Sequence, residues 1–407
     1  MQGADPRALG FDPDDIEFIA DPYSSYERLR AAAPILYDEA TDHWLVTRYD
    51  DVNALLRDRR FGRTYLHTAT HEEMGHDPPS PSLDPFWHLI NHGILDMEPP
   101  DHTRVRRLVS KAFTPRMVES MRTPVQELTD ELVDAVAGGG TFDLLPAIAE
   151  PLPVAVIAEL LGVPRSDRHL LRPWSADICR MYELHPTQED AAVAVAASVE
   201  FSDYLRALSR ERRATPTGDL ISELALVVDE GKRLTEDELI GTCVLLLNAG
   251  HEATVNVTGN GWWALFRTPG ALDRLRAEPA LVPSAVEELM RWDTPLQLFE
   301  RWVLEDVEIH GVRVPRGAEL GLVFGSANRD PSVFDSPDAL RLDREPNPHV
   351  TFGAGIHFCL GAPLARLELQ TSFATVLRRL PKLEVVEEPR WKSGYIIRGL
   401  ESLVVDA

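Results

Sequence analysis

The sequence predicts a large, mainly helical fold with a smaller β region, organised around one long central helix. Residues 236–267 form a run that is apolar on most sides and longer than most globular helices, so it should cross the core. Thr235 and Glu238 form the capping-box pattern that begins this helix, and Pro269-Gly270 ends it. Short strand-like segments between residues 301 and 324, separated by turns, predict the β region.

Local patterns extend this organisation along the chain. Residues 23–33 predict an opening helix, 43–49 a strand and 51–57 a second helix. No Gly/Ser-rich linker, low-complexity tract or internal repeat divides the 407 residues. We therefore expect one domain over residues 1–407, with residues 1–20 as an N-terminal extension.

Residues 62–93 form a long aperiodic segment that is rich in proline and histidine. A loop of this length in a compact domain is usually functional, which predicts a mobile lid over a pocket. A metal site is the alternative, but only one pair of its histidines has the i, i+4 spacing of a helical metal motif. The four histidines considered are His67, His71, His76 and His88, and the pair is His67 with His71.

Composition excludes several classes of function. The formal net charge of −24 argues against a nucleic-acid partner. The three cysteines include no C-x-x-C pair, which excludes the common zinc clusters and a disulfide framework. The first 21 residues lack the features of a signal peptide, and no apolar run reaches the length of a bilayer span. We expect a cytoplasmic monomer without a membrane anchor.

One cysteine lies in a context that indicates a cofactor site. The stretch 352–361 reads Phe-Gly-Ala-Gly-Ile-His-Phe-Cys-Leu-Gly and precedes a helical run over 360–380. Cys359 would lie at the N-terminal edge of that helix, where free N–H groups and the helix dipole favour a metal-binding thiolate. Glycines in this stretch would let the backbone lie against a flat cofactor. A dinucleotide-binding loop is disfavoured, because Phe358 takes the place of its third glycine, and a buried structural cysteine is the other alternative.

Two further patterns depart from what a core or surface helix requires. His102 and Arg106 have i, i+4 spacing after a predicted Asp101 cap, and such paired donors suit a carboxylate ligand. A solvated basic helix is the alternative. In the central helix, Gly250 is followed closely by the acid Glu252, a poor choice for a buried helix and therefore an indication of function.

Together these patterns resemble the cytochrome P450 family. The Phe-Gly-x-Gly-x-His-x-Cys-x-Gly stretch is similar to the family's haem-ligand loop, and the resemblance implies that Cys359 is the axial thiolate of haem b. It also implies the cytochrome P450 fold, with haem between the central helix and the Cys359 helix. Residues assigned to the cofactor are His102, Arg106, Ala249, Gly250, Arg301, Phe352, Gly353, His357, Cys359 and Gly361. The propionate ligands among them are His102, Arg106, Arg301 and His357.

Other residues follow from the same resemblance. Glu288 and Arg291 match the family's Glu-x-x-Arg pair, and with Arg344 they are expected to support the haem-ligand loop. By themselves such pairs are usually surface ion pairs. The residues expected in the substrate pocket are Trp87, Leu246, Asn248, Leu296, Gln297 and Ile396. Asn248 and Gln297 are the possible hydrogen-bond donors among them.

The oxygen-binding part of the central helix departs from the family pattern. Glu252 matches the family's acid and is assigned to proton delivery, but Ala253 stands where an alcohol is usual. Thr254 lies one residue further, about 100° around the helix. Three hypotheses follow: a substrate hydroxyl or ordered water completes the proton relay, Thr254 does so through a helix bulge, or coupling of oxygen use to product is poor.

The resemblance implies a monooxygenase that inserts one atom of dioxygen into a small to medium organic molecule. We expect hydroxylation or epoxidation of a secondary-metabolite, lipid or terpenoid-like substrate, with electrons from NAD(P)H through a ferredoxin reductase and a ferredoxin. A basic surface near Arg104, Arg107 and Arg366 is expected to dock that partner. The alternatives are a non-catalytic haem sensor or recruitment protein, which Ala253 favours, and a peroxide-driven oxygenase.

Overall fold

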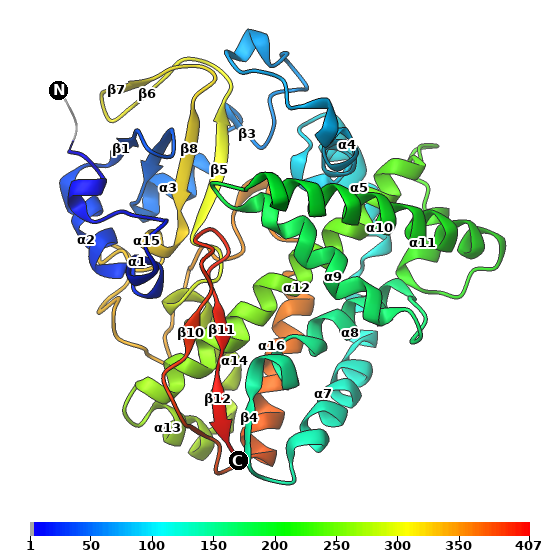
Figure 1. Cartoon of the computed structure of the whole chain (residues 1–407), viewed down its shortest axis with the longest axis vertical. Helices are drawn as coiled ribbons and strands as arrows, with labels where there is room; N and C mark the ends of the chain where they lie inside the picture. Colours follow the sequence, from blue (N-terminus) through cyan, green and yellow to red (C-terminus); the bar gives the residue numbers. More distant parts are fainter. Residues whose placement is uncertain (1–3) are drawn as a thin grey trace.

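The longest helix, α12 (Glu236–Arg267), runs through the middle of the molecule in the computed structural model, which describes residues 4–407 (Figure 1). Its predicted capping box is confirmed: the Glu238 N–H donates to Thr235 Oγ1 over 3.1 Å, and the Thr235 N–H donates to Glu238 Oε2 over 2.8 Å. Most of its residues are buried on all sides, as expected of a helix that crosses the core.

Other helices surround α12, and α4, α8, α9, α10 and α16 pack directly against it. Apart from the N-terminal helices, those longer than one turn are α4 (Asp84–Asn91), α5 (Asp101–Ala112), α6 (Pro115–Ser120), α7 (Arg122–Val136), α8 (Pro151–Leu161), α9 (Arg168–Cys179), α10 (Gln188–Ala214), α11 (Leu220–Leu226), α13 (Ala271–Ala277), α14 (Val282–Trp292) and α16 (Ala362–Arg379). The mainly helical class predicted from the sequence is confirmed, and no helix within residues 4–407 is both long and apolar enough to cross a membrane.

The largest sheet lies at one side of the helices (Figure 1). This five-stranded sheet has the order β1 (Ile35–Asp38), β2 (His43–Val46), β8 (Glu319–Val323), β5 (Leu298–Val303), β3 (Phe61–Gly62), and only the β2–β8 pair is parallel. Smaller sheets join β6 (Val307–Ile309) to β7 (Val312–Val314), β10 (Arg390–Trp391) to β11 (Leu400–Ser402), and β12 (Val404–Asp406) to β4 (Thr141–Asp143) and β9 (Glu384–Val385). Of these strands, β4, β10, β11 and β12 lie lower in the view than the largest sheet, near the C-terminus (Figure 1). The N-terminal helices α1 (Ile16–Ala20), α2 (Tyr23–Ala32) and α3 (Tyr49–Leu55) lie beside the large sheet.

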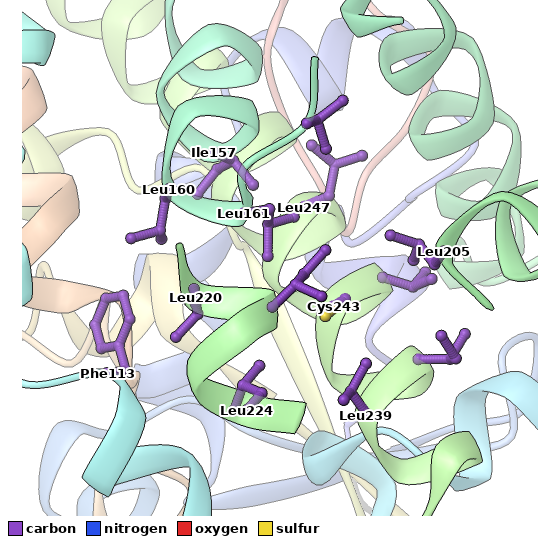
Figure 2. Close-up of a cluster of buried hydrophobic side chains, with 14 of the residues drawn as sticks. Phe113, Ile157, Leu160, Leu161, Leu205, Leu220, Leu224, Leu239, Cys243 and Leu247 are labelled. Atoms are coloured by element: carbon purple, nitrogen blue, oxygen red, sulfur yellow. The ribbon is translucent and has the colours of Figure 1, made fainter. Parts of the chain in front are cut away.

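The largest apolar cluster joins α8, α10, α11 and α12. Figure 2 shows part of it, with Leu160, Leu205, Leu224 and Leu247 around Cys243. Cys243 acts there as a small apolar residue, because burial raises the pKa of its thiol to about 12. Cys243 is therefore not a candidate metal ligand or redox residue.

Three sequence predictions need correction. Residues 62–93 are not aperiodic, since they include α4, and Tyr65 and Met74 are buried against the sheet, so this segment is packed rather than loose. Asp101 is the first residue of α5 and makes no capping hydrogen bond. The segment assigned as an N-terminal extension is packed in the core, because Phe11 and Phe18 contact the ring of Tyr395.

A buried ion network joins α14 to the loops that precede the cysteine stretch. Glu288, Arg291 and Arg344 are between 0 and 4% exposed. Arg291 donates to both Glu288 oxygens over 2.7 and 2.8 Å, and Arg344 Nε approaches the same oxygens at 3.0 and 3.1 Å. The backbone N–H of Arg341 donates a further bond to Glu288 over 2.9 Å. The carboxylate is thus satisfied at each oxygen by charged or backbone donors, which burial of a charge requires.

We expect Arg291→Ala to lower the free energy of unfolding by about 3–5 kcal/mol, because it leaves the Glu288 charge buried without its closest partner. Denaturant unfolding of the purified protein measures this change. Arg274→Ala is the matched control, since Arg274 forms its pairs with Glu278 and Asp343 in solvent. Equal changes in the free energy of unfolding would show that the buried network contributes no more to stability than an exposed ion pair.

Candidate active site

Cys359 lies on a turn that precedes α16. Its N–H donates to the Phe352 carbonyl over 2.9 Å, and the N–H groups of Gly361 and Ala362 point at its sulfur. The predicted N–H groups at the helix edge are therefore present, and they act to lower the pKa of the Cys359 thiol. Burial raises the pKa of the Cys359 thiol and outweighs these donors and the nearby Arg106 charge. A metal ion bound to the sulfur would reverse this balance, because coordination deprotonates a thiol.

Two glycines of the cysteine loop are required by the backbone conformation of its turn. Gly353 and Gly355 have φ angles of +67° and +70°, which L side chains rarely adopt. A Cβ on Gly355 would lie 2.4 Å from the Leu56 carbonyl oxygen. Gly353 and Gly361 leave space beside the loop, since a Cβ would meet only the His357 carbonyl oxygen at 4.0 Å or the Cys359 sulfur at 3.9 Å, respectively.

Along one face of the otherwise buried helix α12, several residues form a stripe that is accessible to solvent. Leu246, Ala249, Gly250 and Ala253 are partly or fully accessible, whereas most neighbours along the helix are buried. Their spacing of three, four and seven residues places them on one helix face. Gly250 also faces α8 closely, because a Cβ would lie 3.0 Å from the Ile157 side chain, which would have to shift to make room.

Two predicted cofactor residues carry buried donors that lack partners. Both ring nitrogens of His102 and the Nη2 of Arg301 are buried and make no hydrogen bond. Burial, aided by the charges of His357 and Arg106, lowers the pKa of His102 to about 4, so the ring is neutral at pH 7. Burial likewise lowers the pKa of Arg301 to about 9. Leaving such groups unpaired is costly, which indicates an acceptor that completes the site.

These orphaned donors lie beside the cysteine loop. The His102 ring is 4.5 Å from that of His357, and Arg106 Nη2 donates to the Phe358 carbonyl over 2.7 Å. The buried donors suit the carboxylates at the edge of a flat metal complex, and the Cys359 sulfur suits its metal ion. The residues present therefore fit haem.

His357 has a partner that the sequence did not indicate. Its Nε2 bonds Glu98 Oε1 over 3.1 Å, and Glu98 also accepts the N–H of Arg63 over 2.7 Å. Although burial alone would raise it, these bonds lower the pKa of Glu98. Since His357 is already bonded here, its assignment to a propionate is weaker than that of His102. Glu98 is distant in sequence from His357, so no local pattern could pair them.

Glu252 contacts a lysine of the C-terminal segment and lies beside the neutral ring of the preceding residue in α12. Its Oε2 lies 3.3 Å from Lys392 Nζ, and its Oε1 lies 3.6 Å from Nδ1 of the buried His251. Ala253 belongs to the accessible stripe, whereas Thr254 is only 6% exposed. The helix is α-helical from Glu236 to Arg267, so the bulge that would bring Thr254 into place is absent and that hypothesis is wrong.

The predicted substrate pocket is only partly supported by the geometry. Asn248 is 3% exposed with both amide atoms unpaired, and the buried Trp87 Nε1 is also unpaired. Gln297 is not available to a substrate, because it accepts from Tyr26 and donates to the Thr294 carbonyl. Two other predicted residues, Leu296 and Ile396, pack against the core cluster of the N-terminal helices.

The expected basic docking surface is largely neutralised. Arg104 pairs with Glu238 and Asp101, Arg107 with Asp229 and Glu230, and Arg366 makes a two-bond contact with Glu287. Each of these arginines therefore carries a local counter-charge, and the simple sequence picture of a free cationic face is wrong.

We expect stability to fall between pH 6.5 and pH 4 because of His251. Burial lowers its pKa to about 4 in the folded chain, so the unfolded chain binds more protons in this range. Acidification should remove up to about 3 kcal/mol of stability through this group. Thermal or denaturant unfolding across this range, compared with His251→Leu, measures it. Parallel curves for the two proteins would contradict the assignment.

Comparison with known proteins agrees with this geometry. Residues 174–390 match the family model "Cytochrome P450". The polyketide biosynthesis cytochrome P450 PksS of Bacillus subtilis is 37% identical, with 98% of each chain covered. The cytochrome P450 monooxygenase PikC of Streptomyces venezuelae is 39% identical over 99% of this chain and 95% of its own.

A solved structure of P450BioI, in complex with an acyl carrier protein ligated to hexadec-9Z-enoic acid, superposes with a TM-score of 0.89. It is 37% identical, and the match covers 96% of this chain and 98% of that one. Identity of this order over the whole length, together with the cysteine loop and the central helix, decides the family. The chain belongs to the cytochrome P450 family of haem-thiolate monooxygenases.

Proposed function

We propose that the protein hydroxylates or epoxidises a medium-sized, mainly apolar secondary metabolite that carries at least one polar group. The observation that supports this most is the accessible stripe of α12, which offers the apolar surfaces of Leu246, Ala249 and Ala253. Next to it, the unpaired amide of Asn248 is a buried polar anchor that a substrate oxygen could satisfy. PksS is named for polyketide biosynthesis, which makes a polyketide-derived substrate the first class to test.

The cofactor residues have distinct tasks in this proposal. Bound haem supplies dioxygen activation, favoured by electron donation from the Cys359 thiolate. His102 and Arg301 bind its carboxylates with donors that are otherwise unpaired. Arg106 holds the Phe358 carbonyl and so positions the loop that presents Cys359. These residues bind and orient the group without themselves reacting.

Proton delivery is assigned to Glu252. Lys392 Nζ lies 3.3 Å from the carboxylate, and in this proposal Glu252 takes up a proton and turns toward the accessible face at Ala253. The neighbouring His251 is neutral at pH 7, because burial lowers its pKa to about 4, and it does not compete as a proton donor. Since Ala253 offers no hydroxyl, either a substrate hydroxyl or an ordered water relays the proton, or the coupling of oxygen use to product formation is poor.

Electrons are proposed to come from NAD(P)H through a ferredoxin reductase and a ferredoxin, because the chain has only three cysteines and no flavin motif. We further propose that the protein acts as a cytoplasmic monomer. A catalytically silent haem sensor and a peroxide-driven oxygenase are the competing functions.

The deciding experiment supplies the purified holoenzyme with a surrogate ferredoxin, its reductase and NADPH. A panel of macrolactones, fatty acids and terpenoids is first screened for the spectral shift that accompanies loss of iron-bound water. We expect oxygenated product from at least one ligand that shifts the spectrum. Tight binding without product would favour the sensor, and product from hydrogen peroxide alone would favour the peroxide-driven enzyme.

We expect His102→Phe and Arg301→Gln each to lower haem retention, because each removes a buried donor to a haem carboxylate. The ratio of haem to protein after gel filtration measures it. Arg313→Gln is the control, since Arg313 is exposed and pairs only with Asp306 on the surface. Full haem content in both site variants would contradict their assignment.

We expect Glu252→Gln to slow product formation by about 10²-fold or more, because a positioned acid typically contributes that much. Ala253→Thr should raise the amount of product formed per oxygen consumed, since it restores a hydroxyl on the accessible face.

Thr258→Val is the control for both substitutions, because the Thr258 hydroxyl donates to the Thr254 carbonyl within the helix. Unchanged coupling in Ala253→Thr would show that the missing alcohol does not limit the reaction.

A further inference from the structure

A cluster of two histidines and an aspartate lies away from the residues assigned to haem. His88 and His92 stand one turn apart at the C-terminal end of α4, and Asp237 lies in the first turn of α12. One ligand atom from each of the three lies within 4.8 Å of the others. In the sequence, His88 follows three other histidines of residues 62–93, and no metal-motif pairing with His92 is predicted.

Close packing of the two helices creates this cluster. Gly241 lies one turn after Asp237 on the same face of α12. A Cβ on Gly241 would be 2.7 Å from the backbone carbon of His92, so only glycine lets the end of α4 approach so closely. The position of His92 beside Asp237 is therefore set by backbone packing rather than by flexible side chains, as α4 also packs against α10 (Figure 1).

The rings of His88 and His92 lie close together, with centroids 4.4 Å apart and planes inclined by 43°. His92 Nδ1 lies 2.7 Å from the His88 carbonyl oxygen, which favours a proton on that nitrogen and leaves Nε2 with its lone pair. Asp237 Oδ1 accepts from Arg206 over 3.3 Å, whereas its Oδ2 lies 3.4 Å from His88 Nε2. Ligand atoms bound at the usual zinc distances in a tetrahedron lie about 3.3 Å apart.

We propose that His88, His92 and Asp237 bind a divalent transition-metal ion of the Zn²⁺ class. Two imidazoles and one carboxylate are a ligand set that such ions prefer, whereas Mg²⁺ and Ca²⁺ prefer oxygen ligands alone. His88 and Asp237 also line a pocket of about 350 Å³ with Asp84, Asp203 and Arg206, and Arg206 pairs with Asp203 and Asp237.

A bound ion would join α4 to the beginning of the central helix. α4 also carries Trp87, one of the residues expected near the substrate, so the ion would hold this segment against α12. An ordinary ion pair between His88 and Asp237 is the alternative, but it gives no role to His92 Nε2. The proposal does not depend on the substrate or on the redox partner.

The test uses untagged, chelator-treated holoenzyme and Zn²⁺ alone as the probe. Isothermal titration calorimetry should show one Zn²⁺ bound per chain and no binding of Mg²⁺. His92→Gln and Asp237→Asn should each weaken Zn²⁺ binding at least tenfold. His67→Gln is the matched control, because His67 is an exposed histidine of the same segment that belongs to no cluster within the described residues.

Hydrogen exchange supplies a second readout. Zn²⁺ should slow amide exchange in residues 84–93 of the wild type but not of His92→Gln, while both proteins keep the same exchange elsewhere. Zn²⁺ binding that survives both substitutions would place the ion elsewhere, for example at His43, Glu300 and Glu319, and would overturn the proposal. Absence of Zn²⁺ binding by the wild type would overturn it as well.

Discussion

Burial of the Glu288 carboxylate connects the core to the cysteine loop. Arg291 neutralises it and also donates to the Asn328 carbonyl over 2.8 Å. The Asn328 side chain accepts the Val350 N–H over 2.8 Å and donates to Thr351 over 3.0 Å, just before the turn that presents Cys359. Since an unpaired charge could not remain at this depth, α14 and this loop must keep their relative positions. The cysteine is therefore held by a network that does not touch it.

Burial also decides the charge states around the proposed haem site. It lowers the pKa of both His102 and His251 to about 4, so neither ring carries charge at pH 7. It raises the pKa of Cys359 despite the backbone donors at the start of α16. The thiolate thus depends on the metal more than on the helix, whereas the neutral rings are properties of the chain itself.

The central helix packs against two neighbouring helices at different points along its length, and between them it keeps an accessible face. Near its start, Gly241 admits the backbone of His92 and so assembles the proposed metal cluster. In its middle, Gly250 lies against the Ile157 side chain of α8. The adjacent stripe from Leu246 to Ala253 stays accessible. Small residues on one helix therefore decide both how closely other helices approach and where space remains.

By itself, the sequence determined the features that local patterns encode. The capping box at Thr235, the course of α12 and the haem-ligand resemblance around Cys359 are all contiguous in the chain, and the helical class follows from them. Only the tertiary structure decided the rest. It showed Glu98 bonded to His357, Gln297 bonded to Tyr26 rather than free, and His92 brought to Asp237. These contacts join segments far apart in sequence, and their geometry depends on burial and close packing, which no single stretch of sequence records.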